Sequence, residues 1–346
     1  MQQHTPVRMA IAGLSHGHVV WLLRNWQRND LDIVGFWEPD RALAERYAEQ
    51  YNFPLAWVYS DLDAMLDAVQ PEAVGAFGSI YDHLRVVEAC APRKIHVMVE
   101  KPLAVSLKHA EIMAALARTH GIQLITNYET TWYASTYAAY RMAIDEGTLG
   151  SIRKVAVHDG HFGPVEIGCN AEFVAWLTDP VLNGGGAVVD FGCYGANLIT
   201  WLMGGAEPVT VTAVLQTLKP EVYPRVDDDA TIILTYPHVQ GIIQGSWNWP
   251  VGRKDMEIYG THGYLVAVDD QTIRVRMREE SSEQTLRLPP APERVSDPFT
   301  YLAAVVRGVE TVTPGNLWSL ENALSVVKIL DAARVSAREG KTVRLE

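Results

Sequence analysis

The sequence predicts an α/β Rossmann domain with a doubly wound parallel sheet, followed by an α+β domain with a large, mainly antiparallel open sheet. Three observations lead to this prediction. The chain has 346 residues, more than one hydrophobic core usually holds. Its first part alternates short apolar runs with segments of helical periodicity, which indicates βαβ units. Its later part consists mostly of strand-like runs. We therefore expect a first domain at 1–126 and a second domain at 127–346, with C-terminal helices at about 297–340 packing back on the first domain.

Composition excludes several classes of function. Hydrophobic residues make up 48% of the chain and the net charge is −12, so there is no basic surplus for nucleic acid or an anionic membrane. No apolar run reaches the ~18 residues of a membrane span, and the first ten residues lack a secretory signal. The three cysteines are scattered, without a metal-binding or disulfide pattern. We expect a cytoplasmic protein.

Elements of the first half follow from apolar periodicity. Asp61 stands where it would cap the helix that begins at residue 62. Strands are expected at 8–12, 32–37, 73–77, 95–99 and 122–126, and helices at 19–28, 41–51, 62–69, 83–91 and 107–120.

Elements of the second half are mainly strands. GTHG and VDDQ turns join the last three of them, which indicates antiparallel hairpins. Strands are expected at 152–158, 209–218, 230–236, 241–249, 256–259, 264–268 and 272–277, and helices at 133–146, 187–203, 298–309 and 320–339.

A nucleotide site is predicted where the first strand ends. Gly13 supplies the sharp turn that a dinucleotide needs, while Ser15 and His18 stand in place of the second and third glycines. Glu38, 25 residues later, ends the next strand, where a carboxylate binds ribose hydroxyls and repels a 2′-phosphate. The alternatives are an ordinary strand-to-helix turn and an acidic cap. NAD is the favoured cofactor, and the nearby Arg41 leaves NADP open.

The pair His16 and His18 also matches an HxH metal motif. No acidic or cysteine partner is evident close to it in the sequence, so we predict no metal site there.

The fifth strand ends in Glu100, Lys101 and Pro102. Open α/β sheets bind ligands at the carboxyl ends of their strands, and an ammonium there can stabilise an alkoxide. The alternative is a surface ion pair between Glu100 and Lys101.

These features, with a later Gly184-Gly185-Gly186 triplet followed by Asp190 and Tyr194, resemble the Gfo/Idh/MocA oxidoreductase family over essentially the whole chain. The resemblance implies nicotinamide-dependent redox chemistry on a sugar or polyol, with Lys101 assisting proton transfer. Tyr194 takes the place of a histidine found in many members, as in the glucose–fructose oxidoreductase and dihydrodiol dehydrogenase branch, where a tyrosine is the proposed proton carrier.

Tyr194 suits this role if its phenol can ionise. A continuous helix would put Asp190 and Tyr194 on one face, and a nearby Lys101 ammonium would lower the phenol pKa from its usual ~10. Asp190 would orient the substrate or Tyr194. The alternatives are an aromatic packed in the core for Tyr194 and a helix-start role for Asp190.

The predicted site is then as follows. The catalytic residues are Lys101, Tyr194 and Asp190. The cofactor contacts Gly13, Ser15, His16, Glu38, Gly78, Ser79, His83, Glu100, Lys101 and Asn127. The substrate contacts Lys101, Trp132, His161, Trp176, Asp190 and Tyr194.

The predicted activity is hydride transfer between NAD(P) and a sugar, cyclic polyol or related secondary alcohol. Two rival functions stay open: an NAD-dependent glycoside hydrolase that uses transient oxidation, and a non-catalytic NAD-sensing binding protein. We also expect a homo-oligomer, a dimer or tetramer, formed through the open sheet.

Overall fold

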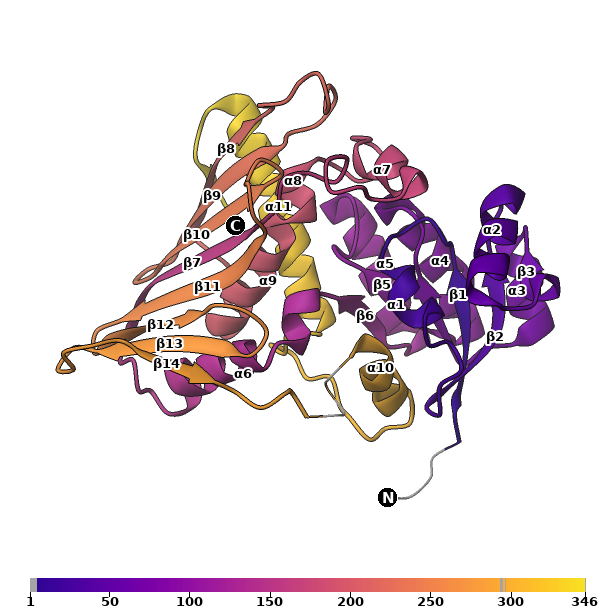
Figure 1. Cartoon of the computed structure of the whole chain (residues 1–346), viewed down its shortest axis with the longest axis horizontal. Coiled ribbons are helices and arrows are strands. Elements are labelled where there is room, and N and C mark those ends of the chain that lie inside the picture. Colours follow the sequence, from indigo (N-terminus) through magenta and orange to yellow (C-terminus); the bar gives the residue numbers. More distant parts are fainter. Residues whose placement is uncertain (1–4, 293–294, 296, 346) are drawn as a thin grey trace.

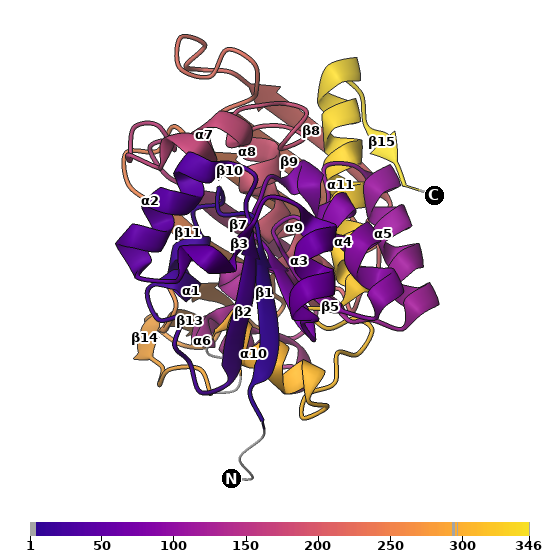
Figure 2. The same cartoon turned by 90° about the vertical axis from the view of Figure 1, so that its right-hand side faces the viewer.

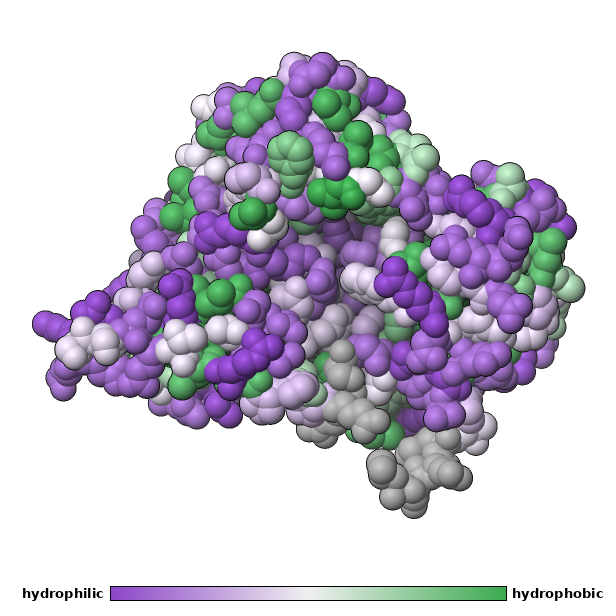
Figure 3. Space-filling model, in the orientation of Figure 1, coloured by the Kyte–Doolittle hydropathy of each residue, from purple (hydrophilic) through white to green (hydrophobic). Residues whose placement is uncertain are grey.

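The protein contains two β-sheets that stand side by side, each covered by helices, with a hollow between them (Figures 1 and 3). The computed structural model describes residues 5–292, 295 and 297–345. One sheet is formed by strands of the first 127 residues and the other by strands of the remaining chain. The predicted fold class is confirmed.

The first sheet has six parallel strands in the order β3-β2-β1-β4-β5-β6. The strand order reverses between β1 and β4, and ligands of open α/β sheets bind at the carboxyl ends on either side of such a reversal. The strands are β1 (Val7–Ala12), β2 (Leu31–Trp37), β3 (Val58–Tyr59), β4 (Ala73–Ala76), β5 (His96–Glu100) and β6 (Leu124–Asn127).

Helices lie on both sides of this sheet (Figure 2). They are α1 (Val19–Leu23), α2 (Arg41–Tyr51), α3 (Leu62–Val69), α4 (His83–Cys90) and α5 (Leu107–His120). Side chains of Asp40, Asp61 and Ser106 accept hydrogen bonds from the first-turn amides of α2, α3 and α5. The prediction that the first helix reaches residue 28 is wrong: α1 ends at Leu23, and Arg28 instead forms an ion pair with Asp30.

The second sheet has nine strands in the order β14-β13-β12-β11-β7-β10-β9-β8-β15. All neighbours are antiparallel except β7 and β10. The short edge strands β14 and β15 were not predicted. The strands are β7 (Ile152–Gly160), β8 (Thr210–Gln216), β9 (Asp229–Thr235), β10 (Gln240–Ser246), β11 (Arg253–Gly260), β12 (Gly263–Ala267), β13 (Thr272–Met277), β14 (Gln284–Arg287) and β15 (Val343–Arg344).

A buried helix covers the inner face of this sheet. The predicted single helix at 187–203 is broken at Phe191 into α8 (Ala187–Asp190) and α9 (Gly192–Leu202). Every residue of α9 is buried. A Cβ at Gly195 would lie 2.6 Å from the Ile243 side chain, so glycine allows α9 to approach β10 this closely. The break redirects the chain immediately after Asp190.

The remaining helices connect the two halves. They are α6 (Ala134–Tyr140), α7 (Ala171–Leu177), α10 (Pro298–Val306) and α11 (Leu320–Glu339). Helix α11 lies between α9 and α5, and its Ala323 and Val327 belong to the apolar cluster of the parallel sheet. Arg307, just after α10, forms an ion pair with Glu72. Among the described helices, none combines the length and the apolar character that crossing a bilayer requires.

Candidate active site

The glycine turn after β1 is closed tightly against the end of β4. Gly13 has φ +87°, and a Cβ there would lie 2.6 Å from the backbone nitrogen of Gly78. Only glycine tolerates both conditions. The turn and the tip of β4 therefore form one surface, as predicted for a dinucleotide site.

Glu38 lies at the tip of β2 beside this turn. Its Oε2 accepts a hydrogen bond from the Leu14 amide at 2.8 Å, and its Oε1 accepts one from the Asp40 amide at 2.9 Å. Burial raises the pKa of Glu38, which these two hydrogen bonds only partly counteract. Each oxygen keeps further acceptor capacity for a ribose hydroxyl.

His16, His18 and Glu100 form a cluster between the glycine turn and the end of β5. His18 Nδ1 donates to Glu100 Oε2 at 2.9 Å, and Asn127 Nδ2 donates to Glu100 Oε1 at 2.8 Å. Burial opposes ionisation of Glu100, but His18 and its other partners hold its pKa at about 2. The carboxylate therefore stays charged and orients His18 towards the cleft.

No acidic partner was expected close to these two histidines. In the folded protein Glu100 is an acidic partner of both, which corrects that expectation. The three groups present ligand atoms within 4.8 Å of one another. However, His16 Nδ1 accepts a hydrogen bond from the His18 amide at 3.1 Å, so Nε2 of the neutral ring carries the proton. That tautomer offers no lone pair to a metal.

Two predicted cofactor residues have their side chains used elsewhere. Ser79 Oγ donates to Asp82 Oδ2 at 2.7 Å and caps a short helical turn. His83 is fully buried and its Nδ1 bonds the Leu103 carbonyl at 3.1 Å. Its Nε2 has no hydrogen-bond partner among the described residues, and contact of His83 with the cofactor stays a prediction.

Lys101 and Asp190 form a buried ion pair that joins the end of β5 to the end of α8. Lys101 Nζ also donates to the Asp190 carbonyl at 3.0 Å, and Asp190 Oδ2 accepts from Trp247 Nε1 at 2.9 Å. Burial alone would lower the pKa of Lys101, but Asp190 raises it above the usual value. Lys101 is therefore a charged donor at neutral pH.

Tyr194 lies beside this pair, 1% exposed, with its ring centroid 5.3 Å from Lys101 Nζ. The prediction that Lys101 lowers the phenol pKa is wrong for the protein alone. Burial raises the pKa of Tyr194 well above its ordinary value, and the carboxylates Glu129 and Asp159 raise it further. The charge of Lys101 is largely balanced by Asp190, so Tyr194 stays protonated.

A second lysine, which the sequence analysis missed, approaches Tyr194 from β11. Lys254 Nζ lies 4.5 Å from the ring centroid and 2.6 Å from Glu129 Oε2. In the sheet register, Lys254 is directly opposite Asp159 of β7. One signal was present in the sequence: both charged residues occupy inward positions of strands whose other inward residues, such as Met256 and Val157, are apolar.

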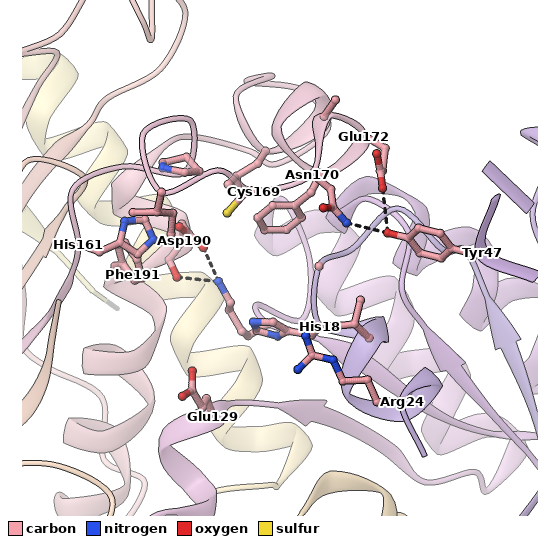
Figure 4. Close-up of a pocket in the computed structure, with 18 of the residues that line it drawn as sticks. His18, Arg24, Tyr47, Glu129, His161, Cys169, Asn170, Glu172, Asp190 and Phe191 are labelled. Atoms are coloured by element: carbon pink, nitrogen blue, oxygen red, sulfur yellow. Dashed lines mark hydrogen bonds and ion pairs between the residues drawn. The ribbon is translucent and has the colours of Figure 1, made fainter. Parts of the chain in front are cut away.

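A cavity of about 730 Å³ brings these groups together. In Figure 4, Asp190, Phe191 and His161 lie across the cavity from Arg24 and Tyr47, with Glu129 below them. Four of the predicted substrate residues line it: Lys101, His161, Asp190 and Tyr194.

The two predicted substrate tryptophans do not line this cavity. Trp132 packs on Trp318, with ring centroids 3.8 Å apart, and donates to Asn127 Oδ1 at 3.0 Å. Trp176 of α7 is 5% exposed and its Nε1 donates to the Ser15 carbonyl at 3.4 Å. Helix α7 thus lies directly over the glycine turn.

The residues at the strand ends fit a dinucleotide. The glycine turn leaves no side chain in the way, Glu38 presents acceptors at the β2 tip, and Asn127 and Glu100 lie at the tips of β6 and β5. Arg41 forms an exposed ion pair with Glu45 on α2. These carboxylate and amide groups suit the hydroxyls of a ribose better than a 2′-phosphate.

Comparison with known proteins agrees with this arrangement. A family model described as "Oxidoreductase family, NAD-binding Rossmann fold" matches residues 7–128, and one described as "GFO/IDH/MocA C-terminal domain" matches residues 137–266. Trans-1,2-dihydrobenzene-1,2-diol dehydrogenase of Bos taurus is 27% identical over 287 residues, covering 81% of this chain and 79% of the relative. The rabbit (Oryctolagus cuniculus) enzyme of that name is 28% identical, covering 73% and 72%.

Solved structures share the fold over almost the full length. An aldose-aldose oxidoreductase from Caulobacter crescentus, complexed with glycerol, has a TM-score of 0.81 at 24% identity, covering 98% of this chain and 100% of that one. An inositol dehydrogenase homolog from Azotobacter vinelandii, complexed with NAD+, has a TM-score of 0.85 at 19% identity, covering 99% and 98%.

Proposed function

Because this chain belongs to the Gfo/Idh/MocA family of NAD-binding oxidoreductases, we propose that it interconverts a secondary alcohol of a sugar, cyclic polyol or related diol with the corresponding carbonyl compound. The observation that carries this proposal is the convergence of Lys101, Asp190 and Tyr194 on one cavity beside the strand ends of the Rossmann domain.

Lys101 and Tyr194 would act together on the oxygen of the reacting carbon. Lys101 is held by Asp190 and stays charged, so its ammonium can hydrogen-bond the oxygen and stabilise negative charge on it. Tyr194 stays protonated, so its hydroxyl can donate a proton when a carbonyl is reduced. In the direction of oxidation, the phenolate form of Tyr194 would have to take the alcohol proton. Asp190 is then a positioning residue for Lys101.

NAD fits the strand ends of the first sheet. When bound, it supplies the hydride acceptor for oxidation or the hydride donor for reduction. Gly13, Ser15 and Glu38 would hold its pyrophosphate and ribose, while Glu100 and Asn127 would lie near the ring that reacts. The acceptor groups of Glu38 support NAD over NADP.

Names of relatives support the substrate class. The curated relatives are dehydrogenases of a trans-diol on a six-membered ring, and two structural neighbours are an aldose-aldose oxidoreductase and an inositol dehydrogenase homolog. All of these names refer to hydroxyl-bearing carbon compounds. Secondary alcohols on a ring or a sugar chain are therefore the first candidates.

A screen of aldoses, inositols and cyclic diols with NAD and NADP, followed by nicotinamide absorbance, tests this proposal. We expect turnover with NAD, and loss of turnover in Lys101→Met and Tyr194→Phe with NAD binding retained. Full turnover in either variant would remove the proposed mechanism. Release of an aglycone from glycosides without net reduction would indicate the glycoside hydrolase alternative instead.

We further propose three properties of the protein as a whole: its domain division, its oligomeric state and its location in the cell. The proposed domain division between residues 126 and 127 lies one residue before the parallel sheet ends at Asn127, and limited proteolysis tests it. A homo-oligomer, assembled through the outer face of the nine-stranded sheet, is tested by light scattering after gel filtration. A cytoplasmic location is supported by three free cysteines, and cell fractionation tests it.

A further inference from the structure

A second cavity continues the first one away from the Rossmann domain. It measures about 630 Å³ and shares four lining residues with the first cavity: Glu129, His161, Phe191 and Lys254. Tyr194 lines the first cavity but not the second. A substrate whose reacting carbon lies at Tyr194 can therefore extend past Lys254 into additional space.

Asp159 lines this second cavity and has no hydrogen-bond partner. It is 2% exposed, and neither of its carboxyl oxygens is hydrogen-bonded. The nearest cation, Lys254 Nζ, lies 3.9 Å from Oδ1, beyond hydrogen-bond distance, and is already bonded to Glu129. A buried polar group without a hydrogen bond is destabilising and rare, so such a group in a cavity points to a ligand.

Asp159 borders two cavities of very different size. The smaller one measures about 10 Å³ and has room for a single water at most. A carboxyl group has several acceptor positions, so one water in the small cavity would leave acceptor positions of Asp159 unpaired.

Charges around the second cavity exclude an anionic ligand. Six carboxyl groups line it, from Glu129, Asp159, Asp255, Glu257, Asp269 and Asp270, against three cations, from Arg253, Lys254 and Arg274. Burial raises the pKa of Asp159 well above its usual value. Hydroxyl groups can donate to carboxylates and accept from cations at the same time. Phe191 and Tyr133 add aromatic surface of the kind that packs on the apolar side of a sugar ring.

We propose that the second cavity is a subsite for a second sugar ring, so that the preferred substrate is a neutral disaccharide or glycoside rather than a single ring. Asp159 binds hydroxyls of the ring that does not react, and Lys254 lies between the two subsites. This proposal rests on the proposed function, because it takes Tyr194 as the reacting end.

The test compares matched sugars on the NAD-loaded protein by calorimetric titration and by nicotinamide absorbance. The probes are D-glucose with maltose and cellobiose, and D-xylose with xylobiose. We expect at least one disaccharide to bind about tenfold more tightly than its monosaccharide. In Asp159→Asn this preference should fall to less than twofold, with monosaccharide binding unchanged. Asp32→Asn, which changes an exposed carboxylate of β2 that lines neither cavity, should leave the preference intact.

A purely structural role for Asp159 gives a different result. In that case Asp159→Asn would lower the unfolding midpoint and weaken all sugars equally, and the proposal would be overturned. Our proposal expects the loss of affinity to be confined to the disaccharides, because Asp159 contacts only the ring that does not react. The proposal would also be overturned if none of the disaccharides bound more tightly than its monosaccharide.

The titration separates this proposal from the proposed function. Tight disaccharide binding without any change of nicotinamide redox state would refute the oxidoreductase assignment and leave the subsite standing. Turnover of monosaccharides and disaccharides with equal efficiency, unaffected by Asp159→Asn, would refute the subsite and leave the oxidoreductase assignment standing.

Discussion

Replacing Lys101 with methionine should destabilise the protein as well as inactivate it. Lys101 and Asp190 have side chains that are 5% and 6% exposed, and they join the end of β5 to the end of α8. Methionine keeps the length and the apolar part of the side chain but leaves Asp190 with only the Trp247 donor on its side-chain oxygens. A buried carboxylate without its cation is therefore the main consequence of the substitution.

The expected magnitude follows from the burial of both partners. Removing one partner of a buried ion pair typically costs about 3–5 kcal/mol. At about 2.1 cal/mol/K per residue, a chain of 346 residues has an unfolding entropy near 0.7 kcal/mol/K. The unfolding midpoint should then fall by roughly 4–7 °C.

The destabilisation should also depend on pH. In the wild type, Lys101 holds the pKa of Asp190 below its usual value despite burial, so this contribution is present at neutral pH and is lost in acid. In the variant, burial without a cation raises the folded-state pKa of Asp190. The loss in the free energy of unfolding then begins above the unfolded-state pKa of Asp190, about 4, and grows as the pH rises. The difference in midpoint should be larger at pH 7 than at pH 4.5.

Differential scanning calorimetry at both pH values measures this effect. Arg41→Met is the matched control, because Arg41 pairs with Glu45 on an exposed helix face and should shift the midpoint by less than about 1 °C. A Lys101→Met midpoint within 1 °C of the wild type, or a shift of equal size at both pH values, would refute the buried-pair reasoning.

Further predictions concern the two ends of the cleft. Gly13→Ala should abolish NAD binding and lower the unfolding midpoint, because the new Cβ would lie 2.6 Å from the Gly78 nitrogen in a backbone with φ +87°. Calorimetric titration with NAD measures the affinity, and a normal affinity would contradict this prediction. Glu38→Gln should raise the NADP-to-NAD ratio of kcat/KM by about tenfold, since a 2′-phosphate no longer meets a carboxylate; an unchanged ratio argues against ribose binding by Glu38. Tyr194→Phe should lower kcat by about 10²–10⁴. In the wild type, kcat for carbonyl reduction should be independent of pH between 6 and 9, because the pKa values of Tyr194 and Lys101 are both raised. A titration near pH 7 in the kcat profile would be inconsistent with these two groups as the donors.

Local signals in the sequence determined much of the architecture. The predicted helices 41–51, 62–69 and 107–120 match the structure residue for residue, because Asp40, Asp61 and Ser106 cap them immediately upstream. The position of Lys101 at a strand end followed from strand and helix alternation, since parallel strands direct their carboxyl ends to one edge. The break at Phe191 was not predicted, because no proline marks it and the neighbouring Asp190 and Gly192 also occur within continuous helices.

The electrostatics of the site were decided by tertiary structure alone. Lys254 meets Asp159 through the pairing of two strands about 95 residues apart, and Glu129 reaches them from a third segment. The protonation state of Tyr194 depends on the sum of these charges and on burial, which raise the pKa that Lys101 alone would lower. Periodicity reports which face of an element is apolar, but the distances between charges of separate elements exist only after the sheets have packed.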